Sequence, residues 1–109
     1  MAWLLRDGEV LATLDVADSI WARFRGLLGR DGVEGALLLR PTKSVHTLGM
    51  RFPIDVAFCD RQMVVVAVRT MRPHRLGRLR WRAHCAIEAE AGAFERWRLR
   101  VGDQLEVRG

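Results

Sequence analysis

Residues 44–60 decide the fold, and they read Ser-Val-His-Thr-Leu-Gly-Met-Arg-Phe-Pro-Ile-Asp-Val-Ala-Phe-Cys-Asp. After a turn expected at Phe52-Pro53, large apolar residues alternate with residues that are small or polar. The large residues are Ile54, Val56 and Phe58. Alternation with a period of two predicts a β-strand that carries these three side chains on one face. The opposite face then presents a carboxylate, Asp55, among small residues.

Other short apolar runs, bounded by turn residues, predict further strands along the chain. These runs are Ala2–Leu5, Val10–Leu14, Ala36–Leu39, Met63–Thr70, His84–Ala89 and Gln104–Val107. The dipeptide Asp7-Gly8 separates the first two runs, which is a strong signal for a β-hairpin. Arg61-Gln62 forms a similarly short link, so we expect the strands on either side of it to be antiparallel partners.

Only one long stretch of the sequence has its apolar residues at the spacing of an α-helix. Within Asp18–Leu28, apolar residues recur at helical spacing, and Gly29 follows as a suitable C-terminal residue. Ala93–Trp97 is long enough for a single helical turn. We therefore predict a single domain over residues 1–109 that is mainly β with one substantial α-helix. Its expected architecture is a compact antiparallel β-sandwich or a partly open barrel.

Composition narrows the class of protein. Of the 109 residues, half are hydrophobic, so we expect a packed core and no extended disorder. The apolar runs are too short to span a bilayer, and Ala2-Trp3-Leu4-Leu5 lacks the basic lead-in of a signal peptide. The expected location is therefore cytoplasmic, with no membrane partner.

Positive charge is concentrated in one part of the chain. The formal net charge is +5, and the segment from Arg61 to Ile87 contains seven arginines without any Asp or Glu. Five of them fall between residues 72 and 82: Arg72, Arg75, Arg78, Arg80 and Arg82. Alternation predicts that Arg78, Arg80 and Arg82 share one face of a strand. All five arginines could contact the phosphates of a nucleic acid while the interleaved Trp81 or His74 stacks on a base. The alternative, which we favour at this point, is a solvated edge whose charge discourages aggregation.

Four blocks of the sequence resemble the signature of a prokaryotic family known as domain of unknown function 192. They are Gly26–Arg30, His46–Asp60, Ile87–Gly92 and Val101–Asp103, and both their order and their spacing fit. The resemblance implies a β-rich fold of the jelly-roll or sandwich kind. Many members carry an N-terminal signal segment, which we do not expect in this chain. The family brings no established substrate or cofactor with it.

Polar residues within apolar surroundings suggest a candidate pocket, formed by His46, Met50, Asp55 and Glu88. Burying an unpaired carboxylate in an apolar strand costs free energy. Asp55 and Glu88 are therefore expected to bind a ligand, to act in catalysis or to have structural partners. A structural role, with backbone amides or arginines as partners, is the simpler explanation for each. If the carboxylates are functional, His46 could join them at one concave, partly solvated cleft.

Metal ligands of the usual types are present but badly spaced. Asp55 and Cys59 would share a strand face at a separation of about 13 Å, so both cannot bind one ion. His84 and Cys85 would point to opposite faces. A site drawn from separate strands, such as His46, Asp55 and Glu88, stays open as an alternative. We nevertheless expect no metal and no cofactor, and we interpret Cys59 and Cys85 as small core residues.

Three functional hypotheses remain in order of preference. The first is a non-catalytic module that binds a small ligand or a protein partner at the candidate pocket. The second is a small enzyme that uses His46, Asp55 and Glu88. The third is a nucleic-acid-associated module that works through the segment Arg72–Arg82.

Overall fold

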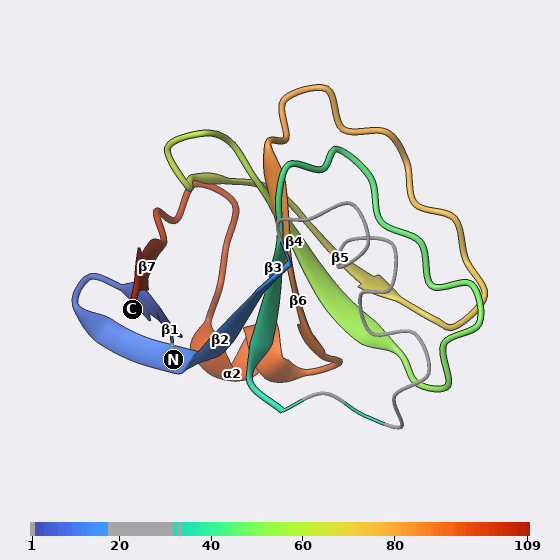
Figure 1. Cartoon of the computed structure of the whole chain (residues 1–109), viewed down its shortest axis with the longest axis horizontal. Helices are drawn as coiled ribbons and strands as arrows, with labels where there is room; N and C mark the ends of the chain where they lie inside the picture. The colour runs from blue at the N-terminus through green and yellow to red at the C-terminus, as the bar shows by residue number, and fades with distance from the viewer. Residues whose placement is uncertain (1, 18–31, 33) are drawn as a thin grey trace.

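One seven-stranded sheet dominates the computed structural model, which describes residues 2–17, 32 and 34–109 of the chain (Figure 1). Its strands follow the order β5-β4-β6-β3-β2-β1-β7. Their bounds are β1 (Ala2–Arg6), β2 (Glu9–Ala17), β3 (Ala36–Leu39), β4 (Ile54–Cys59), β5 (Val65–Met71), β6 (Cys85–Glu90) and β7 (Glu106–Arg108). A short helix, α2 (Ala93–Trp97), follows β6. The predicted mainly-β fold is confirmed, and the single helical turn lies where the sequence predicts it.

Neighbouring strands are antiparallel with one exception, the parallel pair of β2 and β3. The sheet is therefore mixed but mostly antiparallel, in agreement with the predicted antiparallel β architecture. A parallel neighbour needs a connection of a dozen residues or more, and residues 18–35 supply it. The predicted helix over residues 18–28 falls in this connection and lies outside the described residues.

The hairpin between β1 and β2 confirms the turn signal. Asp7 and Gly8 both have positive φ angles, of 52° and 80°. A two-residue turn with two left-handed positions matches the right-handed twist of the strands that it joins. The register shifts between Leu4 and Leu5, so a bulge interrupts the pairing of β1 with β2.

The sheet separates two clusters of buried side chains. In β4, the large residues Ile54, Val56 and Phe58 belong to one cluster, whereas Ala57 and Cys59 belong to the other. All six residues of β4 are buried, because the strand pairs with β5 on one side and β6 on the other. The predicted alternation of this strand is thus confirmed, and it has packed side chains on both faces.

The two edges of the sheet approach one another at one end. A bridge joins Val64 to Gln104, and the Leu105 N–H donates to the Met63 carbonyl at 2.9 Å. These contacts curve the sheet without closing it into a barrel. Across the described ranges, the structure contains no helix with the length and apolar character to cross a lipid bilayer.

Two long loops, residues 40–53 and 72–84, run side by side beyond the ends of the strands (Figure 1). Backbone hydrogen bonds join them at intervals, between Thr42 and His84, Lys43 and Arg80, and Val45 and Gly77. The prediction of a strand over residues 78–82 is wrong, because this segment has no regular ladder. Its backbone instead pairs at irregular points with a loop more than thirty residues earlier in the chain.

Candidate functional site

Most of the predicted basic residues converge on one hollow, which we call the arginine groove. It has a volume of about 430 Å³ and is floored by Phe58 and Met71. Its arginines are Arg69, Arg72, Arg75, Arg78 and Arg80, and no carboxylate is among the lining residues that the structure describes. Four of the five arginines of the predicted anion surface therefore meet here. Arg82 does not, because its segment is a loop and its side chain lines a different hollow.

Strand β5 and the loop that follows it position these guanidinium groups. Arg69 lies opposite Val56, so it projects from the same face of the sheet as Phe58 and Met71. After Met71 the chain leaves the sheet, and the loop returns over this face. Arg80 closes the far wall, with its guanidinium carbon 5.7 Å from the centre of the Phe58 ring. A cation over an aromatic face is attracted by the ring quadrupole, which fixes this side chain in place.

Arg80 also has an unused donor. Its Nε is inaccessible to solvent, and the structure gives it no hydrogen-bond acceptor among the described residues. A buried donor without an acceptor costs free energy, which an acceptor that enters the groove would recover.

Thr47 holds the loop that carries the arginines. Its side chain is fully buried, and its hydroxyl donates to the Arg72 carbonyl at 2.6 Å and accepts from the Arg75 N–H at 2.8 Å. Gly77 lies against the other loop so closely that a Cβ there would be 2.3 Å from the Val45 carbonyl oxygen. The backbone of the arginine loop is therefore fixed even though most of its side chains are exposed.

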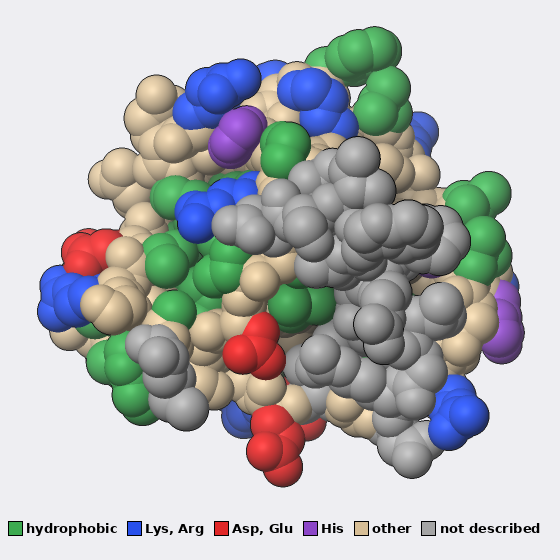
Figure 2. Space-filling view, viewed as in Figure 1, with side chains coloured by type: hydrophobic (Ala, Val, Ile, Leu, Met, Phe, Trp, Pro, Cys, Tyr) green, Lys and Arg blue, Asp and Glu red, His purple; other side chains and the backbone are tan. Residues whose placement is uncertain are grey.

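A second basic hollow has a volume of about 310 Å³. It is lined by Lys43, Asp60, Arg61, Gln62, Trp81, Arg82, Ala83 and His84. All seven arginines of the acid-free segment line one of these two hollows. Figure 2 shows Lys and Arg side chains, with a projecting group of hydrophobic ones, along the upper rim of the molecule, where the loop of residues 72–84 runs.

Asp55 has a structural role at its predicted position. It is 4% exposed and lies on the opposite face from Ile54 and Val56, as the alternation predicts. One carboxylate oxygen accepts from the Thr70 hydroxyl at 2.7 Å. The other accepts from the backbone N–H groups of Gly92 and Phe94, at 2.9 and 3.1 Å. The carboxylate thus orders the turn into α2, as the structural alternative from the sequence proposed.

The candidate pocket of His46, Met50, Asp55 and Glu88 is not assembled. Glu88 pairs with Val56 in the sheet, so Asp55 and Glu88 point to opposite faces. Met50 is buried in the cluster on the Glu88 side, and His46 is exposed on the loop, where it accepts from the Leu48 N–H. The prediction of one cleft is wrong because the register between β4 and β6 separates its two carboxylates.

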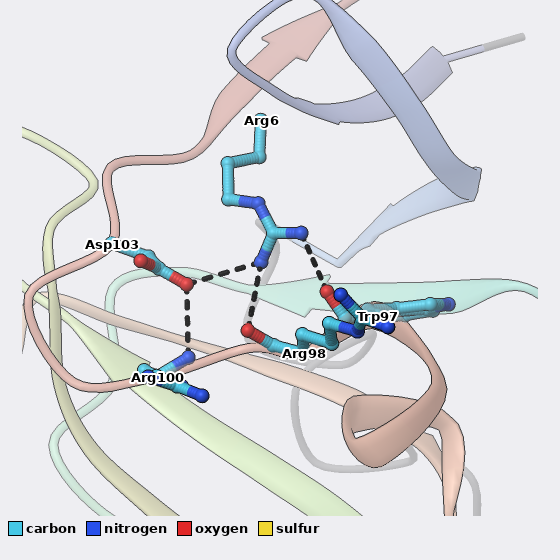
Figure 3. Close-up of polar contacts among 5 residues, drawn as sticks. All are labelled: Arg6, Trp97, Arg98, Arg100 and Asp103. Carbon is cyan, nitrogen blue, oxygen red and sulfur yellow. Dashed lines mark hydrogen bonds and ion pairs between the residues drawn. The ribbon is translucent and has the colours of Figure 1, made fainter.

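Another hollow, of about 620 Å³, lies beside Asp55. Charged side chains of both signs line it, namely Asp55, Glu95, Arg98 and Arg100. One wall is fixed from behind by Arg6, whose guanidinium donates to the carbonyls of Trp97 and Arg98 and contacts Asp103 at 3.1 Å (Figure 3). Asp103 in turn accepts from the Arg100 N–H at 2.9 Å. This network supports Arg98 in a left-handed conformation, with φ of 54°.

The two cysteines are free and buried next to one another at the paired ends of β4 and β6. The hydrogen bond with Cys85 raises the pKa of the Cys59 thiol, and burial raises it further. The described residues contain no group of three or more His, Cys, Asp or Glu that could hold a metal ion.

Sequence reasoning missed three residues that build the arginine groove. Arg69 could have been found, because it precedes Met71 by two positions and so shares its strand face. Thr47 and Lys43 had no local signal. Their partners are 25 to 40 residues away, and Lys43 Nζ donates to the carbonyls of Trp81 and Ala83.

Comparisons with known proteins agree on the family. A UPF0127 protein of Pyrococcus furiosus is 31% identical over 103 residues, which cover 90% of this chain and 89% of that protein. A UPF0127 protein of Thermococcus sibiricus is 31% identical over 97 residues, and the match spans only 63% of its length, less than two thirds.

Two crystal structures share the fold. A protein of unknown function from Novosphingobium aromaticivorans superposes with a TM-score of 0.78 at 14% identity, over 96% of this chain and 82% of that one. A putative transcription regulator from Sinorhizobium meliloti superposes with a TM-score of 0.80 at 20% identity, over 97% of this chain and 91% of that one. The model of the family DUF192, described as Uncharacterized ACR, matches residues 2–107. The chain therefore belongs to the DUF192 family.

Proposed function

We propose that this domain is a non-catalytic binding module that takes a phosphate- or carboxylate-bearing ligand in the arginine groove. The observation that carries the proposal is the gathering of five arginines around one hollow that no carboxylate of the described residues lines. The positive charges of neighbouring arginines repel one another. A bound anion would offset this repulsion, because each arginine would be attracted to it. Guanidinium groups also match the planar geometry of carboxylate and phosphate oxygens.

The fixed backbone beneath the arginines supports the same proposal. Thr47, Gly77 and Lys43 hold residues 72–83 against the neighbouring loop. A binding loop that is already ordered loses less conformational entropy when a ligand arrives. Mere solubility would need no such support, because a flexible loop would keep the charge in water equally well.

The enzymatic alternative built on His46, Asp55 and Glu88 is not proposed again. Its two carboxylates lie on opposite faces of the sheet, and both oxygens of Asp55 already accept hydrogen bonds from the protein.

Titration with inorganic pyrophosphate and with citrate, followed by backbone amide NMR, tests the proposal. We expect saturable shifts in residues 69–80 that weaken as salt is added. The double variant Arg72→Glu/Arg75→Glu should abolish them. Arg98→Glu/Arg100→Glu, which changes the net charge equally but lines the hollow beside Asp55, is the matched control and should bind normally.

Two results would contradict the proposal. One is the absence of saturable shifts for either anion at low ionic strength. The other is an equal loss of the anion-induced shifts in both double variants, because anion binding would then depend on the net charge of the protein and not on the arginine groove.

A further inference from the structure

The two basic hollows adjoin along the chain. Arg80 lines the arginine groove, whereas Trp81 and Arg82 line the second hollow. Consecutive residues of one loop therefore line both hollows. Together they form a track that we call the basic track, defined by the lining residues of both hollows.

Charge along the basic track is almost wholly of one sign. Among its described lining residues the only carboxylate is Asp60, and its Oδ1 accepts from the backbone N–H groups of Gln62 and Val64. Seven arginines thus face a ligand at several successive places. A single small anion would engage few of them, whereas a chain with repeated negative charges could engage most.

An exposed aromatic side chain lines the second hollow. Trp81 is 77% exposed, and Lys43 Nζ donates to its backbone carbonyl at 2.8 Å. The indole is therefore presented to solvent on a fixed backbone. Exposed aromatic side chains beside cationic grooves are the means by which proteins stack the unpaired bases of single strands.

We infer that the basic track binds single-stranded nucleic acid, with phosphates at the arginines and a base stacked on Trp81. This inference rests on the proposed function, since it names the anion that the arginine groove takes. Double-stranded DNA is usually read by a helix or a β-ribbon that enters a groove, and residues 72–84 form neither. A flexible single strand can instead follow two hollows around the exposed loop.

An anionic membrane is the main competitor. Leu76 and Leu79, on the same loop, are 76% and 52% exposed and could enter a bilayer interface beside the arginines. The concave placement of the arginines favours a single-stranded nucleic acid as the ligand, because a flat lipid surface cannot bring its phosphates into two hollows.

Fluorescence anisotropy with a short labelled oligo-dT and oligo-rU tests the inference on the full chain. For about five phosphate contacts, we expect log K to fall with log salt with a slope of about −3.5. Trp81→Ala should weaken oligonucleotide binding about tenfold and leave the affinity for inorganic polyphosphate unchanged. Trp81→Phe keeps an aromatic ring and should retain most of the affinity for the oligonucleotide. Trp3→Ala, which removes a 40% exposed indole from β1, is the matched control.

The outcomes separate this inference from the proposed function. If polyphosphate binds but Trp81→Ala has no effect on oligonucleotides, the groove is an anion site and the single-strand inference is wrong. Equal affinity for a duplex also overturns it. The inference is also wrong if the protein binds phosphatidylglycerol vesicles but not oligonucleotides, and if the double variant Leu76→Asp/Leu79→Asp loses this vesicle binding. If no anion binds at all, the proposed function fails as well.

Discussion

The hydroxyl of Thr47 is fully buried and accepts the backbone N–H of Arg75 at 2.8 Å, so a residue of one loop determines the conformation of the other. The same hydroxyl donates to the carbonyl of Arg72. Arg72 and Arg75 are both exposed and both line the arginine groove. The geometry of this groove therefore depends on a residue that is not in it.

Thr47→Val keeps the shape of the side chain and removes both hydrogen bonds. The Arg75 N–H would lose its acceptor in a buried setting, so we expect a loss of about 1–3 kcal/mol in the free energy of unfolding. Chemical denaturation measures this loss. Thr42→Val is the control, because the Thr42 hydroxyl makes an exposed bond to the Ser44 carbonyl, and it should cost under about 0.5 kcal/mol. Equal losses in the two variants would mean that Thr47 has no special role in the loop.

Asp55→Asn tests whether the buried carboxylate is structural. The substitution is nearly isosteric but weakens the hydrogen bonds from Gly92 and Phe94, which are stronger to a charged acceptor. We expect a loss of about 2–4 kcal/mol in the free energy of unfolding, measured from the denaturation midpoint and slope. Asp15→Asn, at an exposed position of β2, should change stability little. A loss below about 0.5 kcal/mol at Asp55 would return this residue to the list of candidate binding groups.

Local patterns predicted the strands well, because alternation within a strand depends only on its own residues. They placed Asp55 on the other face of its strand from Ile54 and Val56, and this assignment is confirmed. What they could not supply was the register between β4 and β6. Val56 lies opposite Glu88, so the two carboxylates face away from each other. A shift of one residue would have put them on the same face.

The basic segment shows the same limit in another form. The concentration of arginines was visible in the sequence, and four of the five predicted residues do share a hollow. Their alternation suggested a strand, but the backbones of Arg75, Gly77 and Arg80 pair with residues 43–47, and no local pattern indicates these partners. The charge was predictable, whereas the concave shape that collects it came from contacts distant in sequence.

Arg6→Met tests the network that fixes the turn after α2. The variant keeps much of the apolar stem but removes the donors to Trp97, Arg98 and Asp103. The ion pair is partly exposed, so we expect most of the loss to come from the two carbonyls, in total about 1–2 kcal/mol. Thermal unfolding followed by circular dichroism gives the value.

Arg108→Met is the control for that variant. Its exposed pair with Glu106 joins residues two apart on β7, and such pairs contribute little. A change in stability at Arg6 no larger than that at Arg108 would contradict a supporting role for the network.

The two cysteines give the last prediction, which concerns local opening of the sheet. Cys59 and Cys85 are 0% and 1% exposed, and only a thiolate that meets solvent reacts quickly with a thiol reagent. The hydrogen bond with Cys85 and burial both raise the pKa of Cys59, which further disfavours its thiolate. We expect both thiols to react with an aromatic disulfide at least about 100-fold more slowly in the folded protein than in denaturant. Leu48→Cys, at a position that is 45% exposed, should react rapidly and serves as the control. Rapid reaction of the native cysteines would mean that the paired ends of β4 and β6 open far more readily than their packing indicates.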